Sequence, residues 1–213
     1  MKVVFSVLFS LVCLASFGQS DFATEVANLQ KESAEKGFEN PVIFIGSSSI
    51  KMWKSLEQDF PGFDVLNHGF GGSEYSDLLK HQAALIEDFE ASMIVVYAGD
   101  KDIANGEEPA AIAEEAETFV DGMRRLANGS PVLILSVKPS ISRWELKDKY
   151  IELNGRLKNV AASFDHAVFV DVWSPMLKRN KEVNPKLFIE DGLHMNEKGY
   201  EIWKNALLPF LSK

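Results

Sequence analysis

The chain has 213 residues, 46% of them hydrophobic, and a formal net charge of −9 at neutral pH. A chain of this length is in the range of a single α/β domain and can bury a large core without disulfides or structural metals. The acidic balance, without any cluster of basic residues, argues against nucleic acids and anionic membrane surfaces as partners.

The first 18 residues have the pattern of a secretory signal peptide. Lys2 provides a short positive region, an apolar stretch runs from Val3 to Ala15, and the small residues Ser16 and Gly18 precede a cleavage site before Gln19. An uncleaved membrane anchor is the alternative. The apolar stretch is short for a bilayer span, however, so we expect no stable membrane insertion. Cleavage would also remove the single cysteine of the chain, and with it any disulfide or thiol nucleophile. The sequence therefore predicts a secreted or periplasmic protein.

Residues 22–213 are expected to form one domain in which apolar runs alternate with helical patterns. The runs lack the alternation of half-exposed strands, which is typical of strands buried on both faces of a parallel sheet. The predicted strands are Val42–Ile45, Asp64–Leu66, Ser92–Tyr97, Val132–Val137 and Val168–Val172. The predicted helices are Ile50–Gln58, Tyr75–Phe89, Pro109–Ala127, Trp144–Ser163 and Glu197–Leu211. This order predicts an α/β fold with helices on both faces of a five-stranded parallel sheet.

Small and polar residues follow the predicted strands, at the sheet edge where α/β proteins bind their ligands. The segments concerned are Gly46–Ser49, Asn67–Ser73, Gly99–Asp102 and, before the last helix, Glu190–His194. Together they supply a serine at a helix start, a glycine-rich backbone and an Asp-x-x-His pair. These are the parts of a hydrolytic serine site.

Each candidate residue has a physical reason for its place. Ser48, at a strand-to-helix turn, would hold its hydroxyl above the sheet and its N–H near the positive end of a helix. Gly72 would let a backbone N–H approach a developing oxyanion without a side chain in the way. His194 can take the serine proton at one ring nitrogen while Asp191 holds the other. Each segment alone is more often a turn or a cap, so the interpretation rests on their joint placement.

Four segments, FIGSSSI, NHGFGG, YAGDKD and DGLHMN, resemble in this order the conserved blocks of the SGNH (GDSL-like) hydrolases. The resemblance runs from about Pro41 to the last helix. It implies a three-layer α/β/α, flavodoxin-like fold and an esterase or acylhydrolase activity with no metal or other cofactor. In the matching positions, Ser48 is the nucleophile, His194 the general base and Asp191 its orienting carboxylate. The N–H groups of Ser48 and Gly72 are implied as donors of the oxyanion hole.

Lys101 departs from the family pattern. The third block is Gly-x-Asn-Asp, whose asparagine side chain donates to the oxyanion, and Lys101 stands at the asparagine position between Gly99 and Asp102. An ammonium group is also a donor, and its charge would stabilise an oxyanion. Lysine is longer and more flexible than asparagine, however, and Asp100 or Asp102 can draw its charge aside. We expect a poor replacement, so that asparagine at this position would raise turnover; a working cationic donor and a lysine turned onto either carboxylate are the alternatives.

The sequence thus predicts an exported serine esterase that cleaves carboxylic esters through an acyl-enzyme. The expected substrates are small-molecule, glycan or lipid esters with short acyl or acetyl groups. The alternative is a catalytically impaired member of the fold that binds carbohydrate or lipid. This alternative stays open because Lys101 replaces the asparagine of the family pattern. The sequence carries no signal for an oligomeric state.

Other residues were considered for ligand contacts. His68, His81 and His166 lack partners at the spacing of metal ligands, so no metal site is expected. The aromatic residues near strand ends are expected mainly in the core, with a pocket wall as the alternative; they are Trp53, Phe70, Trp144 and Trp173.

Overall fold

The structure is a computed structural model and describes residues 22–211. The expected signal peptide at residues 1–18 lies outside the described residues. Between residues 22 and 211, no helix is both long enough and apolar enough to span a bilayer.

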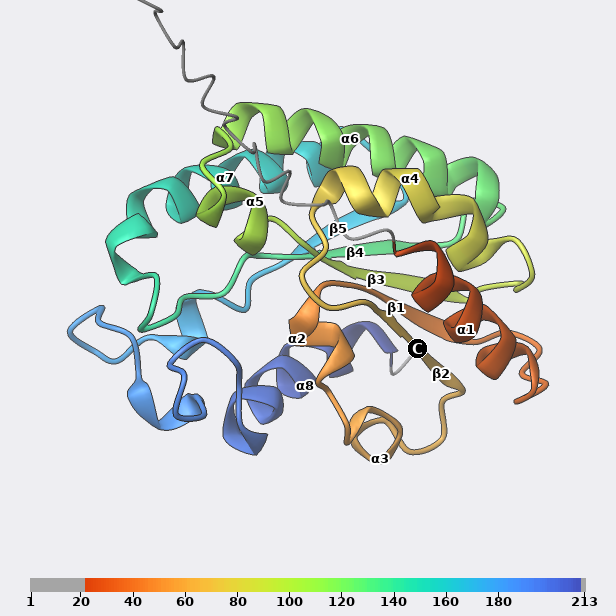
Figure 1. Cartoon of the computed structure of the whole chain (residues 1–213), viewed down its shortest axis with the longest axis horizontal. Coiled ribbons are helices and arrows are strands. Elements are labelled where there is room, and N and C mark those ends of the chain that lie inside the picture. The colour runs from red at the N-terminus through yellow and green to blue at the C-terminus, as the bar shows by residue number, and fades with distance from the viewer. Residues whose placement is uncertain (1–21, 212–213) are drawn as a thin grey trace, which may run out of the picture.

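A parallel five-stranded sheet forms the middle of three layers, with helices above and below it (Figure 1). The strands follow the order β2-β1-β3-β4-β5 across the sheet, and neighbouring strands pair in parallel. Their bounds are β1 Val42–Gly46, β2 Val65–Gly69, β3 Met93–Tyr97, β4 Val132–Leu135 and β5 Ala167–Val170. The predicted α/β/α architecture is confirmed.

The helices divide between the two faces of the sheet (Figure 1). One face is covered by α1 Ala23–Ala34, α4 Tyr75–Ile86, α6 Pro109–Leu126 and α7 Lys147–Ala162. The other face is covered by α2 Ser48–Lys51, α3 Leu56–Asp59 and α8 Glu197–Leu211. The short helix α5, Asp100–Ala104, follows β3 at the carboxyl edge of the sheet.

Each strand contributes side chains to two separate cores. In β1, Ile43 and Ile45 pack beneath the first group of helices, while Val42 and Phe44 pack against the second group. Successive strand residues point to opposite faces, so a strand covered on both sides must be apolar at every position. β5 departs from this expectation, because it is an edge strand and leaves Val168 39% exposed.

The predicted helix Ile50–Gln58 is wrong in detail, since the chain forms α2 and α3 with a turn between them. Trp53 lies in that turn with its ring buried, stacked on Tyr200 at a centroid distance of 5.1 Å. Its indole N–H donates to Asp59 at 2.8 Å, and Ser55 donates to the same carboxylate at 2.6 Å. Contacts with α8 and with Asp59 therefore hold Trp53 in this turn.

Three other elements differ from the prediction. β2 continues through Asn67 and His68 to Gly69, residues that the sequence pattern placed in a loop. Helices α1 and α5 were not predicted, because α1 has a weak apolar stripe and α5 is only 5 residues long. His68 is fully buried in β2, and its ring nitrogens contact Leu85 O and Ser33 Oγ, each at 2.8 Å.

Candidate active site

A cavity of about 260 Å³ opens at the carboxyl edge of the sheet. The segments that follow β1, β2, β3 and β4 and the segment before α8 all contribute to it. Its lining residues are Ser47, Ser48, Gly72, Asp100, Lys101, Arg143, Leu193 and His194. The structure therefore brings together Ser48, Gly72, Lys101 and His194, which the sequence predicted from separate loops. A wider hollow of about 590 Å³ lies beyond the His194 segment, with Met52, Ile189 and Met195 among its walls.

The position of Ser48 depends on a close approach between two strands. A Cβ atom on Gly46, the last residue of β1, would lie 2.1 Å from the carbonyl oxygen of Tyr97 in β3. Only glycine fits there. The next residue, Ser47, donates its N–H to the same Tyr97 oxygen at 3.1 Å, and α2 begins at Ser48. This turn places Ser48 at the end of the central strands, as predicted.

The segment that carries Asp191 and His194 is held by backbone hydrogen bonds. The carbonyl oxygen of Gly192 accepts N–H groups from Ile141 at 2.8 Å and Ser142 at 3.2 Å, both in the segment after β4. Asp191 Oδ1 accepts the backbone N–H of His194 at 2.9 Å. The carboxylate thus caps its own turn and fixes the backbone from which the imidazole projects.

Ser48, His194 and Asp191 form a continuous chain of hydrogen bonds. Ser48 Oγ lies 2.9 Å from His194 Nε2, and Asp191 Oδ2 lies 2.6 Å from His194 Nδ1. Although desolvation opposes it, the bonds from the His194 side chain and from the Leu193 and His194 amides lower the pKa of Asp191 to about 2. An ionised carboxylate only accepts, so Nδ1 carries the proton; in the tautomer that this selects, Nε2 is the nitrogen that can accept from the Ser48 hydroxyl.

Gly72 and Ser48 present free backbone donors at this cavity. Within residues 22–211, neither backbone N–H has a hydrogen-bond partner. Gly72 has a φ of +81°, which favours glycine, and a Cβ atom there would meet nothing within 4 Å. The positive φ therefore favours glycine at this position.

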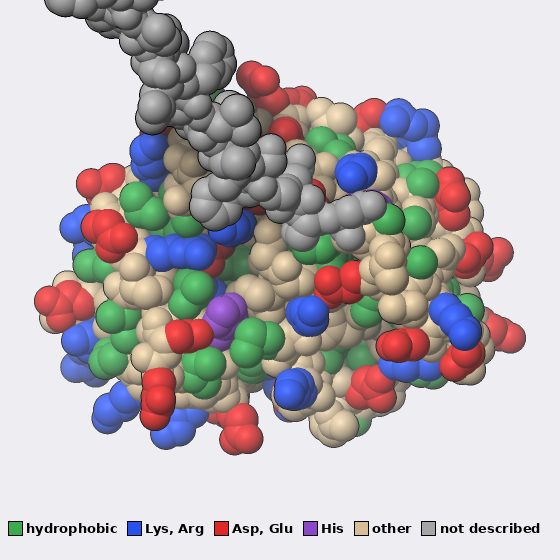
Figure 2. Space-filling view, in the orientation of Figure 1, with side chains coloured by type: hydrophobic (Ala, Val, Ile, Leu, Met, Phe, Trp, Pro, Cys, Tyr) green, Lys and Arg blue, Asp and Glu red, His purple; other side chains and the backbone are tan. Residues whose placement is uncertain are grey.

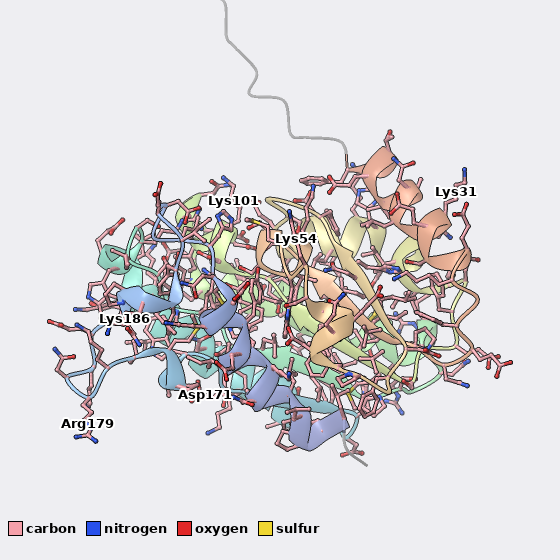
Figure 3. All side chains as sticks on the ribbon, turned by 90° about the horizontal axis from the view of Figure 1, so that it is seen from below. Lys31, Lys54, Lys101, Asp171, Arg179 and Lys186 are labelled. Carbon is pink, nitrogen blue, oxygen red and sulfur yellow. The ribbon has the colours of Figure 1, made fainter. Side chains whose placement is uncertain are left out.

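Lys101 lines the cavity, and its side chain makes no hydrogen bond or ion pair within the described part of the chain. In Figure 3, Lys101 lies between Lys31 and Arg179, which project at the two ends of the molecule. The carboxylates on either side of it have other partners: Asp102 accepts the N–H groups of Tyr75 at 2.8 Å and Gly99 at 3.0 Å. The structure thus gives no support to a lysine turned onto a neighbouring carboxylate.

Asp100 is the centre of a buried charge network. Its carboxylate accepts from Lys138 Nζ at 3.3 Å, Arg143 at 2.6 Å and the Tyr150 hydroxyl at 2.8 Å. Desolvation opposes ionisation, yet the charges of Lys138 and Arg143 outweigh it and lower the pKa of Asp100. Lys138 is itself 1% exposed, so the network is a buried ion pair whose members depend on one another.

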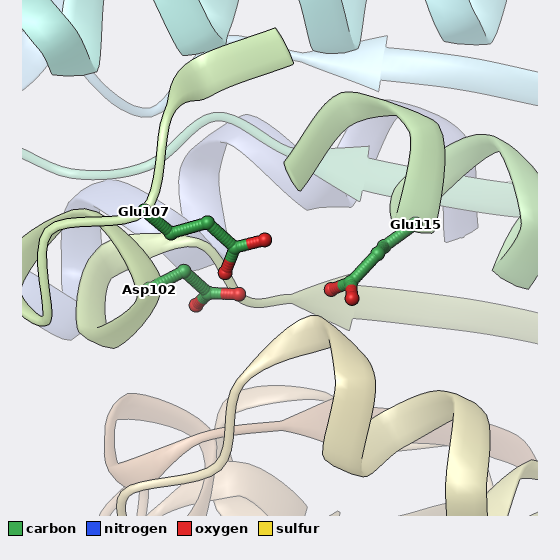
Figure 4. A group of neighbouring side chains, drawn as sticks. All are labelled: Asp102, Glu107 and Glu115. Atoms are coloured by element: carbon green, nitrogen blue, oxygen red, sulfur yellow. The ribbon is translucent and has the colours of Figure 1, made fainter. Parts of the chain in front are cut away.

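Three carboxylates, one of them in α5, lie close together (Figure 4). One oxygen each of Asp102, Glu107 and Glu115 lies within 4.8 Å of the others, the spacing of a possible cation site. Burial, with the charges of Glu74 and Glu107, raises the pKa of Asp102 to about 7. Asp102 accepts from the first N–H of α4, so the group sits at a helix N-terminus, where negative charge is stabilised. None of the three lines the Ser48 cavity.

Lys138 and Arg143 were not predicted from the sequence. Both follow β4 and precede α7, in the one strand-end segment for which no functional residue was predicted. Ligand-binding residues follow the carboxyl ends of parallel strands, which lie at the same edge of the sheet. The segment after β4 therefore carried a signal for Lys138 and Arg143. Their partner Asp100, which is 7% exposed, could not be distinguished by sequence from the cavity-facing Lys101 beside it.

The aromatic residues considered as pocket walls lie outside this cavity. Trp53 and Phe70 are 1% and 0% exposed and belong to the core, as expected. Trp144 and Trp173 stack on each other with ring centroids 6.0 Å apart.

Residues 46–202 match the GDSL-like Lipase/Acylhydrolase family, which confirms the resemblance predicted from the sequence. No curated protein matches the chain.

Solved structures share the fold at low sequence identity. One is named as a platelet activating factor from Streptococcus pneumonia, with 19% identity, a TM-score of 0.79, and coverage of 88% of this chain and 92% of that chain. A GDSL-like lipase from Bacteroides thetaiotaomicron has 22% identity and a TM-score of 0.70, covering 88% and 98%. An acetyl-xylooligosaccharide esterase from Geobacillus stearothermophilus, in mutant form, has 14% identity and a TM-score of 0.67, covering 82% and 94%.

Asp100→Asn is expected to destabilise the protein by about 3–5 kcal/mol, because it leaves Lys138 and Arg143 without the carboxylate that compensates their burial. Urea unfolding of the two proteins measures the difference. Asp121→Asn is the matched control, since Asp121 pairs with Arg125 on the surface and should cost less than about 1 kcal/mol. Equal losses in the two variants would contradict the interpretation of the buried network.

Proposed function

Because the chain belongs to the GDSL-like lipase/acylhydrolase family and is therefore a carboxylic ester hydrolase, we propose that it works through an acyl-enzyme formed on Ser48. The observation that carries this proposal is the hydrogen-bond chain from Ser48 Oγ through His194 to Asp191. A hydroxyl bonded to an unprotonated imidazole nitrogen, with the other nitrogen held by a carboxylate, is the arrangement that activates a serine.

The reaction follows from this arrangement. Ser48 Oγ attacks the ester carbonyl while His194 Nε2 takes its proton, and the Asp191 carboxylate stabilises the imidazolium that forms. His194 then returns the proton to the oxygen of the leaving alcohol, and the acyl group stays on Ser48. A water molecule, deprotonated by the same nitrogen, attacks the acyl-enzyme and releases the acid.

The negative oxygen of the tetrahedral intermediate is stabilised by the free N–H groups of Ser48 and Gly72. Lys101 supplies a third donor. From the sequence we expected a poor donor, because lysine is longer and more flexible than asparagine and because Asp100 or Asp102 could draw its charge aside. Both carboxylates have other partners, which supports the role of Lys101 as a donor. Lys101 lines the cavity, and its unpaired ammonium is a donor whose charge would favour the oxyanion.

The proposed substrate is an ester with a short acyl group, above all acetyl. A cavity of about 260 Å³ beside Ser48 suits a small acyl group, and the wider neighbouring hollow suits a larger alcohol such as a glycan or a lipid headgroup. The shared fold with an acetyl-xylooligosaccharide esterase supports a glycan ester.

Ser48→Ala should lower kcat on 4-nitrophenyl acetate by roughly four to six orders of magnitude and abolish labelling by a fluorophosphonate. Asp191→Asn should cost up to about ten-thousand-fold, because the amide favours the wrong imidazole tautomer. Ser49→Ala is the control, since the buried Ser49 does not line the cavity. Labelling that persists in Ser48→Ala would move the nucleophile elsewhere, and a wild type that neither labels nor hydrolyses esters would favour the binding-module alternative.

Lys101→Met should lower kcat on the same acetate by about a hundred- to a thousand-fold, the cost of one oxyanion donor. Lys101→Asn should recover much of this loss, because the amide is also a donor. KM should change little in either variant, since the oxyanion exists only near the transition state. A Lys101→Asn enzyme faster than wild type would show instead that lysine is a poor replacement for asparagine.

We further propose that the protein is exported, on the basis of the signal-like pattern in residues 1–18. Expressed at full length in a Gram-negative host, it should be recovered from the periplasm or the medium with Gln19 as its first residue. N-terminal sequencing or intact mass spectrometry measures this. Cytoplasmic protein that retains Met1 would rule the proposal out.

A further inference from the structure

Arg143 contributes a second cationic side chain to the cavity of Ser48. Its terminal nitrogen NH1 donates to Asp100 Oδ1 at 2.6 Å and to the Asp100 carbonyl oxygen at 3.2 Å. These bonds hold the guanidinium in place, with 22% of the side chain exposed. A guanidinium has five N–H donors, so anchoring through one nitrogen leaves other donors for a ligand in the cavity.

The charges around this cavity do not cancel. The cations are Lys101, Lys138 and Arg143; the carboxylates are Asp100, which pairs with Lys138 and Arg143, and Asp191, which holds His194. The carboxylate of Asp102 faces the N–H groups of Tyr75 and Gly99 and does not line the cavity. The site therefore carries an excess of one positive charge in a protein whose net charge is −9.

An anchored guanidinium beside a free ammonium is suited to bind an oxyanion. Arginine presents parallel N–H donors that match the two oxygens of a carboxylate, and lysine adds a point charge. The excess of one positive charge favours a monoanion over a dianionic phosphate monoester. The cavity of about 260 Å³ also contains Ser48, so the anion must lie only a few bonds from the scissile carbonyl.

We propose that Arg143, assisted by the charge of Lys101, binds a carboxylate that the ester substrate carries close to its scissile bond. The substrates are then esters of acids or alcohols that bear a carboxylate, such as an acylated hydroxy acid or sugar acid. This inference rests on the proposed hydrolysis at Ser48 and specifies its substrate. Arg143 determines specificity here, while the Ser48–His194–Asp191 chain performs the reaction.

The test compares esters that differ only in charge. On the acyl side the pair is monoethyl succinate and its neutral amide, ethyl succinamate; on the alcohol side it is O-acetyllactate and O-acetyllactamide. In at least one pair, kcat/KM for the charged ester should exceed that for the neutral one by about ten- to a hundred-fold, the size of a hydrogen bond to a charged group. The pair that shows the preference identifies the part of the substrate that carries the anion.

Arg143→Gln should bring this ratio close to one, and Arg143→Lys should retain part of it. Arg156→Gln is the matched control, because Arg156 pairs with Glu152 on the surface of α7 and should leave the ratio unchanged. If Arg143→Gln does not fold, the salt dependence of the wild type gives the same information. The ratio should fall as NaCl rises from about 10 to 500 mM, because salt screens the attraction.

The outcomes separate the two proposals. Hydrolysis of 4-nitrophenyl acetate with a ratio of one in both pairs would overturn the carboxylate subsite and leave the esterase proposal standing. A preference for O-acetylglycerol 3-phosphate over both carboxylate esters would also overturn it. Failure to hydrolyse any ester would reject the proposed function itself.

Discussion

The arrangement of the site depends on one buried carboxylate, that of Asp100. It joins segments that are distant in the sequence, because its partners Lys138 and Arg143 follow β4 and Tyr150 belongs to α7. A charge buried to this extent is stable only while its partners are in place, so the network fixes these segments relative to one another. The segment between Lys138 and Arg143 also holds the Gly192 carbonyl oxygen, and with it the turn that carries Asp191 and His194.

Consecutive residues of α5 serve three different surroundings. Asp100 faces the buried cations, Lys101 lines the cavity, and Asp102 accepts the N–H groups of Gly99 and of Tyr75 at the start of α4. A helix turns by about 100° per residue, so neighbours on one turn point in different directions. This explains how a lysine between two aspartates keeps an unpaired ammonium group. On the face shown in Figure 2, an exposed histidine is surrounded by hydrophobic side chains, with both acidic and basic side chains nearby.

Free backbone amides and cationic side chains thus meet at one small cavity. The amides of Ser48 and Gly72 are free because the first begins a helix and the second lies in a turn with a positive φ, so neither is used by the secondary structure. Asp100 binds Lys138 and Arg143 and so holds the guanidinium of Arg143 at the cavity. Groups held in place before the substrate arrives lose little freedom on binding it.

The sequence by itself determined the layers of the fold and the members of the hydrogen-bond chain. Continuous apolar runs such as Val42–Ile45 require cover on both faces of a sheet, and Ser48 and Gly72 follow from the rule that ligand groups stand after parallel strands. Asp191 and His194 were found as an Asp-x-x-His pair before the last helix. Only the tertiary structure decided the break at Trp53, the exposure of Val168 at the sheet edge, the partners of Asp100 and the unpaired side chain of Lys101. These depend on contacts between residues about 40 or more positions apart, such as Asp100 with Arg143, and on which side of a short helix each charge faces. Local patterns of hydrophobicity carry no information about either.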